Sequence, residues 1–288
     1  MILEGKTLAA RLRAPLQERA EAVRLELGRP ITLCAIGSSD DYAAYVYLKK
    51  EVQAAEKLGV QCHMHSVSND TSVSEFLDLL QKASEDENVD AVLVARPLPP
   101  ALAESGFARF IAPQKDIDGM STQAAGNLFL CKTWQEVEAL PTFLPCTALA
   151  VIRLLDEYGI DPQGMEAAVI GRSPTVGRPL AHLLSCRNAT VKLCHSFTQD
   201  LGRSLQGAQL ICCAAGRPEL LKADYVQSGA TVIDIATNLD AQGRLCGDAQ
   251  TQALLHKGCF VSPVPGGVGP ITLACLLENI ILSGERKS

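Results

Sequence analysis

Residues 167–179 read AAVIGRSPTVGRP, and this segment is the most informative about the fold. Its apolar start predicts a buried strand over 167–171, and the turn that follows leads into a helix from about Gly177. Small residues in such a turn allow the backbone to approach the pyrophosphate of a dinucleotide, and the first N–H groups of the helix favour that anion. Ser173 stands where the usual G-x-G-x-x-G motif has its second glycine, so a plain β–α turn is the alternative interpretation.

The end of the next strand, 189–194, indicates which dinucleotide would bind. A site for NAD usually ends this strand with Asp or Glu, which binds the ribose 2′-hydroxyl. Here His195 and Ser196 follow the strand instead, and the nearest acid, Asp200, is expected in the next helix. Arg172 and Ser196 are suited to a 2′-phosphate, so the pattern favours NADP. The alternatives are an exposed loop charge for Arg172 and a structural role for His195.

On both sides of this segment, apolar strands alternate with amphipathic helices along the chain. This order predicts parallel βαβ units, and therefore an α/β protein with two α/β domains, the second a Rossmann-type doubly wound parallel sheet. A change in composition across the proline-containing segment Thr142–Thr147 places the domain boundary there. The expected strands are 31–36, 60–65, 89–95, 167–171, 189–194, 209–214, 231–235 and 259–264. The expected helices are 8–27, 41–58, 73–83, 148–158, one from about 177, and 271–282.

Composition excludes several classes of function. The chain has 288 residues, 47% of them hydrophobic, which is enough for two domains of medium size. A formal net charge of −6 argues against nucleic acid as a partner, because binding a polyanion needs a basic surface. No apolar run looks long enough to cross a membrane, and no secretory signal begins the chain. We therefore expect a cytoplasmic protein whose eleven cysteines are reduced, buried thiols.

A metal site is a further alternative at Cys62-His63-Met64-His65. On a strand, His63 and His65 would point to the same side, as metal ligands do. Because no third ligand accompanies them in the sequence, an exposed strand end is the simpler interpretation, and we expect no metal.

Several segments together resemble the methylenetetrahydrofolate dehydrogenase/cyclohydrolase family, in the family order and over nearly the whole chain. They are residues 3–6 (LEGK), 45–49 (YVYLK), 113–119 (PQKDIDG), 145–147 (PCT), 171–179 (GRSPTVGRP), 188–191 (NATV), 194–196 (CHS) and 263–272 (PVPGGVGPIT). Each of the shorter segments is weak alone, whereas the last is long and specific.

The resemblance implies an N-terminal folate-binding domain, residues 1–142, to which the C-terminal helix 268–288 returns. It also implies an NADP-binding Rossmann domain, residues 143–267, an active cleft between the two domains, and a homodimer formed through the Rossmann domain. The implied reaction is NADP-dependent oxidation of 5,10-methylenetetrahydrofolate to the methenyl compound, followed in the family by hydrolysis to 10-formyltetrahydrofolate.

The resemblance also assigns roles to residues on the folate side. Tyr45 would stack on the folate, Lys49 would be the catalytic lysine, and Asp118 would bind the pteridine ring. Tyr45 and Lys49 are four residues apart and so share one helix face. Spacing alone favours a core aromatic for Tyr45 and a surface charge for Lys49, and a turn acid is the alternative for Asp118. Gly267 and Pro270 would place backbone beside nicotinamide and folate, or else form a turn that opens the terminal helix.

On the cofactor side, the resemblance assigns binding to residues of both strand ends and of the last turn. They are Gly171, Arg172, Ser173, Val176, Gly177, Ser196 and Gly267.

Four positions around the folate depart from the family pattern. Tyr42 replaces a serine, Ala95 a glutamine that would bond the catalytic lysine, Arg96 a leucine, and Ala124 an asparagine. The cofactor side keeps the pattern. We therefore expect the dehydrogenase activity to be kept more readily than the cyclohydrolase activity. The alternatives are an NADP oxidoreductase that acts on another small molecule and an NADP-binding protein without turnover.

Overall fold

The computed structural model describes residues 1–287, and the chain divides into two compact units. The first, called here the five-stranded unit, consists of Met1–Arg11, Leu128–Leu140 and Pro145–Cys275. The second, the three-stranded unit, consists of Leu12–Asn127, Pro141–Leu144 and the residues from Leu276 onward. The division into family domains at residue 142 remains a prediction.

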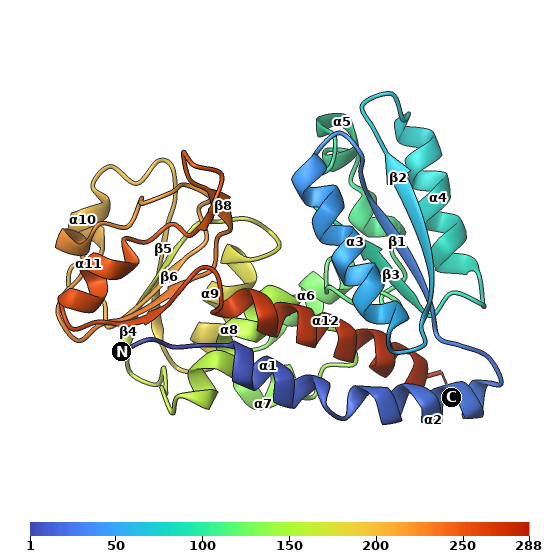
Figure 1. Cartoon of the computed structure of the whole chain (residues 1–288), viewed down its shortest axis with the longest axis horizontal. Coiled ribbons are helices and arrows are strands. Elements are labelled where there is room, and N and C mark those ends of the chain that lie inside the picture. The colour runs from blue at the N-terminus through green and yellow to red at the C-terminus, as the bar shows by residue number, and fades with distance from the viewer. Residues whose placement is uncertain (288) are drawn as a thin grey trace. The chain divides into compact units, whose positions relative to one another are not determined.

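The three-stranded unit is built on a parallel sheet in the order β2-β1-β3. Its strands are β1 (Thr32–Ser38), β2 (Gln61–Val67) and β3 (Ala91–Val94). Helices α3 (Tyr42–Glu56) and α4 (Val73–Glu85) lie on opposite faces of this sheet (Figure 1). Alternate residues of β1 point to opposite faces, so Cys34 and Ile36 join the core under α4, which includes Phe76 and Leu80.

The predicted helix over 8–27 is wrong as a single element. The structure has α1 (Lys6–Arg13) and α2 (Leu16–Leu27), with Pro15 at the N-terminal cap of α2. Proline lacks the N–H that a helix interior needs and its ring crowds the preceding turn, so the helix stops and restarts there. Shorter elements that the periodicity did not predict are α5 (Pro100–Ala103), η1 (Phe107–Phe110), α6 (Thr122–Leu130) and α7 (Trp134–Glu138).

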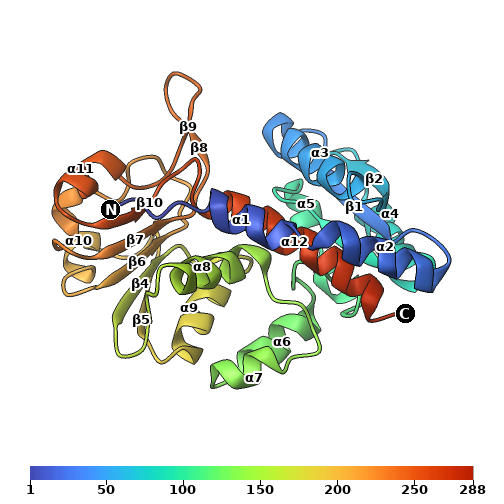
Figure 2. The ribbon, with the colours of Figure 1, turned by 60° about the horizontal axis from the view of Figure 1, so that its bottom comes forward.

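The five-stranded unit contains a fully parallel sheet in the order β10-β7-β6-β4-β5, which confirms the predicted Rossmann-type fold (Figure 2). Its strands are β4 (Glu166–Ile170), β5 (Thr190–Cys194), β6 (Leu210–Cys213), β7 (Thr231–Asp234) and β10 (Phe260–Ser262). Its helices include α8 (Cys146–Glu157), α9 (Gly177–Cys186), α10 (Leu201–Ser204) and α11 (Thr251–His256). A hairpin of β8 (Asn238–Leu239) and β9 (Leu245–Cys246) projects from the sheet.

The terminal helix α12 (Val268–Glu285) corrects one expectation, since it is long and apolar enough to cross a membrane. The sequence was expected to contain no such segment. However, 61% of the helix is buried inside the protein, which is the pattern of a core helix. Its apolar residues are therefore accounted for by packing.

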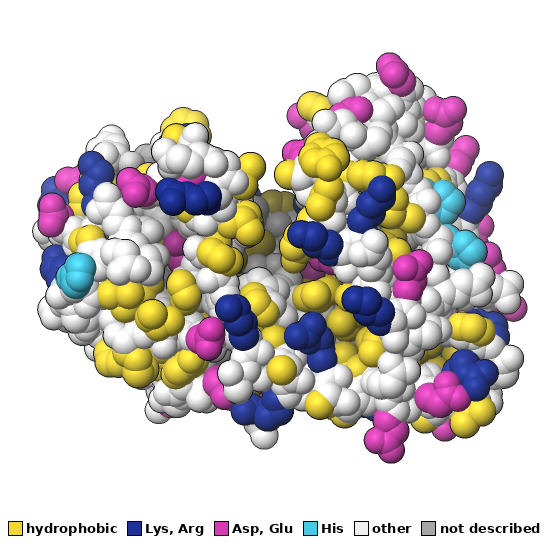
Figure 3. All heavy atoms as spheres, viewed as in Figure 1, with side chains coloured by type: hydrophobic (Ala, Val, Ile, Leu, Met, Phe, Trp, Pro, Cys, Tyr) yellow, Lys and Arg dark blue, Asp and Glu magenta, His cyan; other side chains and the backbone are white. Residues whose placement is uncertain are grey.

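The structure shows where the charged side chains and the cysteines lie. On the face shown in Figure 3, lysine and arginine side chains are interspersed with acidic, polar and hydrophobic ones. All eleven cysteines are free thiols, nine of them buried and two half-buried. The nine buried thiols serve as small core residues, as expected, whereas Cys62 and Cys246 are only half-buried.

A buried carboxylate joins the starts of two strands in the three-stranded unit. The Asp90 side chain is fully buried just before β3 and accepts the backbone N–H of Thr32 at 2.8 Å. The Arg29 guanidinium donates to both Asp90 oxygens, at 2.7 and 2.8 Å, and Lys287 donates at 3.1 Å. These bonds hold the pKa of Asp90 below its ordinary value, although burial acts in the opposite direction.

We predict that Asp90→Ala lowers the free energy of unfolding by about 3 kcal/mol, because it leaves Thr32 N–H and Arg29 without their acceptor. Urea unfolding at neutral pH measures the change. The control is Glu21→Ala, which removes an exposed pair with Arg24 and should leave the free energy of unfolding nearly unchanged. Equal effects of the two substitutions would contradict the role given to Asp90.

Candidate active site

Helix α3 carries the first two candidate residues. The Asp41 carboxylate accepts the N–H of Ala44 at 2.9 Å and so fixes the start of this helix. Tyr45 is half-buried and Lys49 is exposed, with the Lys49 ammonium 4.5 Å from the centre of the Tyr45 ring. The structure therefore brings the two side chains together on one face of the helix, as their spacing predicted. Their catalytic roles remain predictions.

Glu51, which the sequence reasoning missed, lies on the inward face of the same helix. It belongs to the buried stripe of α3 with Leu48, Val52 and Ala55, and only 9% of its surface is exposed. Burial raises the pKa of Glu51 to about 8, and the negative charge of Asp118 adds to the shift. Glu51 is therefore a neutral acid at pH 7 within electrostatic reach of Asp118. Its spacing from the apolar residues Leu48 and Ala55 could have predicted that Glu51 faces the core.

The loop that presents Asp118 is anchored first by Lys115. The buried Lys115 ammonium donates to the carbonyl oxygens of Ala83 (3.2 Å) and Asp86 (2.6 Å) at the end of α4. A cation at this end of a helix satisfies carbonyl groups that have no partner within the helix. The Lys115 carbonyl in turn accepts the N–H of Val92 at 2.7 Å, which ties the loop to β3.

The same loop is closed by Asp116. This buried carboxylate accepts the N–H of Met120 at 2.9 Å and that of Ser121 at 2.5 Å. Burial raises the pKa of Asp116, while these bonds act in the opposite direction. On the other side, the Asn279 amide donates to the Ile117 carbonyl at 2.8 Å. Asp118, half-buried, thus projects from a loop whose neighbours on both sides are fixed.

The positions that depart from the family pattern lie in different surroundings. The Arg96 guanidinium lies 5.2 Å from the centre of the Phe107 ring, and the residue is exposed. Burial of part of the side chain lowers the pKa of Arg96, and the charge of Asp118 opposes that shift. Ala95 is half-buried, Ala124 is buried in α6, and the large Tyr42 side chain is 81% exposed.

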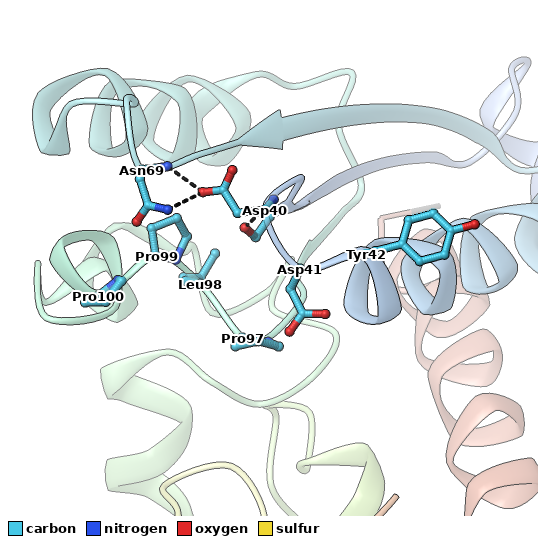
Figure 4. Close-up of a pocket in the computed structure, with 9 residues that line it drawn as sticks. Asp40, Asp41, Tyr42, Asn69, Pro97, Leu98, Pro99 and Pro100 are labelled. Atoms are coloured by element: carbon cyan, nitrogen blue, oxygen red, sulfur yellow. Dashed lines mark hydrogen bonds between the residues drawn. The ribbon is translucent and has the colours of Figure 1, made fainter. Parts of the chain in front are cut away.

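A pocket of about 390 Å³ opens at the carboxyl ends of the three strands in this unit (Figure 4). It is lined by Ser38, Asp40, Asp41, Tyr42, Asn69 and Pro97 to Pro100. Asp40 accepts both the backbone N–H and the side-chain amide of Asn69, at 2.7 and 2.6 Å, and the Tyr42 ring extends away from this pair. Tyr45, Lys49 and Asp118 are not among its lining residues.

In the five-stranded unit, two glycines allow the turn after β4 to close tightly. A Cβ atom on Gly177 would lie 2.0 Å from the Gly171 carbonyl oxygen, and one on Gly171 would lie 2.2 Å from that of Ala214. Gly171 also has φ +121°, which disfavours any other residue. The start of α9 and the ends of β4 and β6 therefore meet through backbone contacts, as a dinucleotide loop requires.

Ser173 has a local task in this loop that differs from the expected one. Its hydroxyl oxygen accepts the N–H groups of Val176 (3.1 Å) and Gly177 (3.3 Å), so it takes up donors at the start of α9. These two N–H groups therefore have an acceptor within the loop itself. The binding of a pyrophosphate at the start of α9 remains a prediction.

Arg172 and Ser196 emerge next to each other from paired strands. Ile170 of β4 pairs with Cys194 of β5, and the N–H of Gly171 donates to the Cys194 carbonyl at 2.9 Å. Both Arg172 and Ser196 are exposed, and His195 is half-buried. This donor set, without a carboxylate at the end of β5, fits the 2′-phosphate of NADP. Asp200 caps α10 by accepting the N–H of Arg203 at 2.9 Å.

The loop after β6 is held by two buried carboxylates that the sequence reasoning missed. Asp248 accepts the N–H groups of Ala215 (2.7 Å), Gly216 (3.1 Å) and Arg217 (2.6 Å). Asp234, at the end of β7, accepts the N–H groups of Asp248 and Ala249, both at 2.9 Å. Burial raises the pKa of Asp234 to about 7, and the charge of Asp248 adds to the shift. No local pattern marks these acids as acceptors for a distant loop.

The turn around Gly267 is also tightly packed. A Cβ atom on Gly267 would lie 2.1 Å from the buried hydroxyl of Ser262, and one on Gly5 would lie 2.0 Å from the Gly267 carbonyl oxygen. The Ser262 hydroxyl has no hydrogen-bond partner among residues 1–287. Helix α12 begins one residue after Gly267, and Pro270 lies in its first turn.

The histidine pair on β2 gains no further ligand. His63 and His65 are both exposed, and the nearest polar contact of His63 is with Gln61, at 3.3 Å. In the described part of the chain, no group of three or more His, Cys, Asp or Glu residues is arranged to hold a metal ion.

Comparison with known families identifies the family of the two units that carry the folate-side and cofactor-side candidate residues. Residues 3–118 match the catalytic domain of tetrahydrofolate dehydrogenase/cyclohydrolase, and residues 145–288 match its NAD(P)-binding domain. The chain belongs to the tetrahydrofolate dehydrogenase/cyclohydrolase family. The resemblance found in the sequence is thereby confirmed.

Individual relatives match this chain along nearly the full length of both proteins. The bifunctional protein FolD of Elusimicrobium minutum is 51% identical over 287 residues, which cover 100% of both chains. The crystal structure of the bifunctional FolD enzyme of Campylobacter jejuni superposes with a TM-score of 0.91 at 34% identity, covering 100% of this chain and 99% of that one. The Trypanosoma brucei enzyme, solved with NADP and an inhibitor, gives 0.89 at 28% identity, covering 99% and 97%.

We predict that Gly177→Ala destabilises the family's dinucleotide loop, because the added methyl group meets a backbone oxygen that cannot move aside. The free energy of unfolding should fall by roughly 2 kcal/mol or more. Gly126→Ala is the matched control, since nothing lies within 4 Å of its Cβ position. Thermal unfolding of both variants measures the effect, and a Gly177→Ala protein as stable as the control would refute the close approach.

We predict that Glu51→Gln removes a pH dependence of stability. The folded protein keeps a proton on Glu51 up to about pH 8, whereas the unfolded chain loses it near pH 4.5. Wild-type stability should therefore fall as pH rises between these values, and the glutamine variant should lack this part of the fall.

The readout is the difference in melting temperature between wild type and variant from pH 5 to pH 8. Glu56→Gln, at an exposed position of the same helix, is the control. A difference that does not change with pH for Glu51→Gln would show that Glu51 is ionised in the folded protein.

Proposed function

We propose that this protein oxidises 5,10-methylenetetrahydrofolate to 5,10-methenyltetrahydrofolate with NADP as the hydride acceptor. The observation that carries the proposal is the family match over both units, which includes the folate side and the dinucleotide side of the reaction. The relatives that match along the full chain are bifunctional dehydrogenase/cyclohydrolase enzymes.

In this reaction, a hydride leaves the bridging methylene carbon of the folate, and the lone pair of an adjacent folate nitrogen stabilises the resulting methenyl cation. NADP, when bound, supplies the carbon that receives the hydride. The protein therefore contributes mainly by positioning the two reactants and excluding water. A rigid arrangement of loops is what such chemistry needs from the chain.

On the folate side, we assign three side chains by their match to the family. Tyr45 stacks on the folate, and Asp118 accepts paired hydrogen bonds from the pterin N–H and amino groups. Lys49, held 4.5 Å from the Tyr45 ring centre, is the catalytic lysine. The fixed loop on both sides of Asp118 supports its assignment, because a carboxylate in a defined position can bind a planar ligand at two points.

On the cofactor side, Gly171 and Gly177 allow the backbone to approach the pyrophosphate, and Ser173 and Val176 complete that loop. Arg172 and Ser196 bind the 2′-phosphate. Their positions after paired residues of β4 and β5, and the lack of an acid at the end of β5, support NADP over NAD. The backbone at Gly267 and Pro270 lies against nicotinamide and folate.

A second activity, hydrolysis of the methenyl compound to 10-formyltetrahydrofolate, also belongs to the proposal. Water adds to the methenyl carbon, and the ring opens with proton transfer, for which Lys49 is the assigned group. Ala95 lacks the amide that bonds this lysine in the family, so we expect this step to be weaker than hydride transfer. The bifunctional relatives support both activities.

The alternatives, a different small-molecule substrate or NADP binding without turnover, find no support among these relatives. They rested on Tyr42, Ala95, Arg96 and Ala124. Tyr42 is mostly exposed and Arg96 lies on Phe107, so neither side chain is committed to blocking Tyr45 or Lys49.

We also propose that the protein is a homodimer. The two edge strands of the five-stranded sheet, β10 and β5, differ in what covers them. The N-terminal residues cover β10, since the N–H of Leu3 donates to the Val261 carbonyl at 2.8 Å. Among the residues described, no strand pairs with the outer edge of β5, and Leu193 is exposed there. An open strand edge that also carries an exposed leucine favours association with a second copy.

A cytoplasmic location is the remaining part of the proposal, with neither nucleic acid nor a membrane as a partner. The eleven free thiols and the burial of α12 support it.

The direct test of the function follows nicotinamide reduction by the purified protein with 5,10-methylenetetrahydrofolate, using NADP and NAD in parallel. Turnover that is faster with NADP is the expected result. Absence of turnover in a protein that binds NADP would refute the proposed reaction.

We predict that Lys49→Gln lowers methenyl hydrolysis by roughly 10²- to 10⁴-fold, because it removes the group that transfers protons. Hydride transfer should change much less, since that step relies on positioning. The matched control is Lys50→Gln, an exposed lysine one residue along α3, which should leave both rates unchanged. Equal losses of the two activities in Lys49→Gln would contradict a specific role in hydrolysis.

A further inference from the structure

Phe197 is an exposed aromatic residue directly after Ser196, beside the end of β5. Its side chain is 79% exposed, although large apolar residues usually gain stability from burial. The residue lies outside the hydrophobic core of its unit. An exposed ring next to two assigned phosphate-binding residues calls for a reason other than packing.

The chain fixes this ring through a tight turn over residues 195–198. The N–H of Thr198 donates to the His195 carbonyl at 2.8 Å, and the Thr198 hydroxyl accepts the N–H of His195 at 2.9 Å. The N–H of Phe197 donates to Nδ1 of the His195 ring at 3.2 Å. The two rings lie edge to face, with centres 6.3 Å apart. His195, for which the sequence suggested a structural role, thus supports Phe197.

Arg172 lies over this ring. The guanidinium carbon of Arg172 is 5.5 Å from the centre of Phe197, within the range of a cation–π interaction. Arg172 comes from the loop after β4, whereas Phe197 comes from the turn after β5, so the contact joins the two strand ends. The face of a ring attracts the guanidinium without using any of its N–H donors.

We propose that Phe197 is a positioning residue that holds the Arg172 guanidinium where it meets the 2′-phosphate of NADP, and that it thereby helps to set the preference for NADP over NAD. This inference rests on the proposed NADP-dependent function and extends it to a residue without an assigned role.

The physical reason lies in the flexibility of arginine. A free arginine side chain loses rotamer entropy when it binds a phosphate, and ordering it beforehand reduces that loss. The ring orders the guanidinium and leaves its N–H donors, which point outward in the plane of the group, available for the phosphate oxygens. NAD has no 2′-phosphate, so its binding should not depend on this arrangement.

The test measures equilibrium binding by calorimetry for NADP and NAD, and for the fragments 2′,5′-ADP and 5′-AMP. Phe197→Ala should weaken NADP and 2′,5′-ADP roughly 2- to 30-fold, the range expected for a cation–π contact, with NAD and 5′-AMP nearly unchanged. Phe197→Tyr should keep the wild-type affinity for NADP, because tyrosine retains an aromatic face. Phe197→Leu should lose affinity as Phe197→Ala does, because leucine has none. Phe129→Ala, at a 77% exposed phenylalanine of the same unit, is the control and should change nothing.

A double-mutant cycle tests whether Phe197 acts through Arg172. If it does, Phe197→Ala has no further effect on 2′,5′-ADP binding once Arg172 is replaced by alanine. Independent, additive losses would overturn the inference. An equal loss of NADP and NAD affinity in Phe197→Ala would also overturn it. So would an equal affinity for NADP in Phe197→Leu and Phe197→Tyr. A wild-type protein that binds NADP no better than NAD would overturn the proposed cofactor as well, and the two failures are thereby distinguished.

Discussion

In each unit, one loop at the end of a parallel strand depends on the same interaction, a buried carboxylate that accepts backbone N–H groups. Asp116 accepts two N–H groups and closes the loop that presents Asp118. Asp248 accepts three and fixes the loop after β6, while Asp234 accepts two and holds Asp248 in turn. A buried carboxylate without such partners would be strongly destabilising, so each acid and its loop have to form together. Both units use this device at loops next to the carboxyl ends of parallel strands, where α/β proteins bind ligands.

Rigid loops suit a reaction in which a hydride passes directly between two bound molecules. Little proton transfer accompanies that step, so its rate depends on how well the reactants are placed. The glycines at 171 and 177 serve the same end, since they let strand, turn and helix meet through backbone alone. The second reaction, hydrolysis, needs a proton-transferring side chain. Two departures from the family pattern, Ala95 and Arg96, affect positions expected to act on the catalytic lysine. The dinucleotide loop keeps the family pattern.

The sequence predicted the parts of this structure that local patterns control. Continuous apolar runs predicted the parallel strands, and the four-residue spacing predicted that Tyr45 and Lys49 share a helix face. The break at Pro15 was missed because helical periodicity continued across it. Glu51, Asp234 and Asp248 were missed for another reason: their surroundings come from segments distant in sequence, and an isolated acid carries no sign of its future partners. Phe197 belongs to the same group, because its contact with Arg172 exists only once β4 and β5 are paired.

In the proposed reaction, the protein passes a hydride directly from the folate methylene group to NADP. The most direct measurement supplies 5,10-methylenetetrahydrofolate labelled with deuterium at the bridging carbon and analyses the reduced nucleotide by mass spectrometry. Direct transfer yields reduced NADP that carries deuterium, with methenyltetrahydrofolate as the first folate product. Reduced nucleotide without deuterium, or no reduced nucleotide from a protein that binds both ligands, would contradict it.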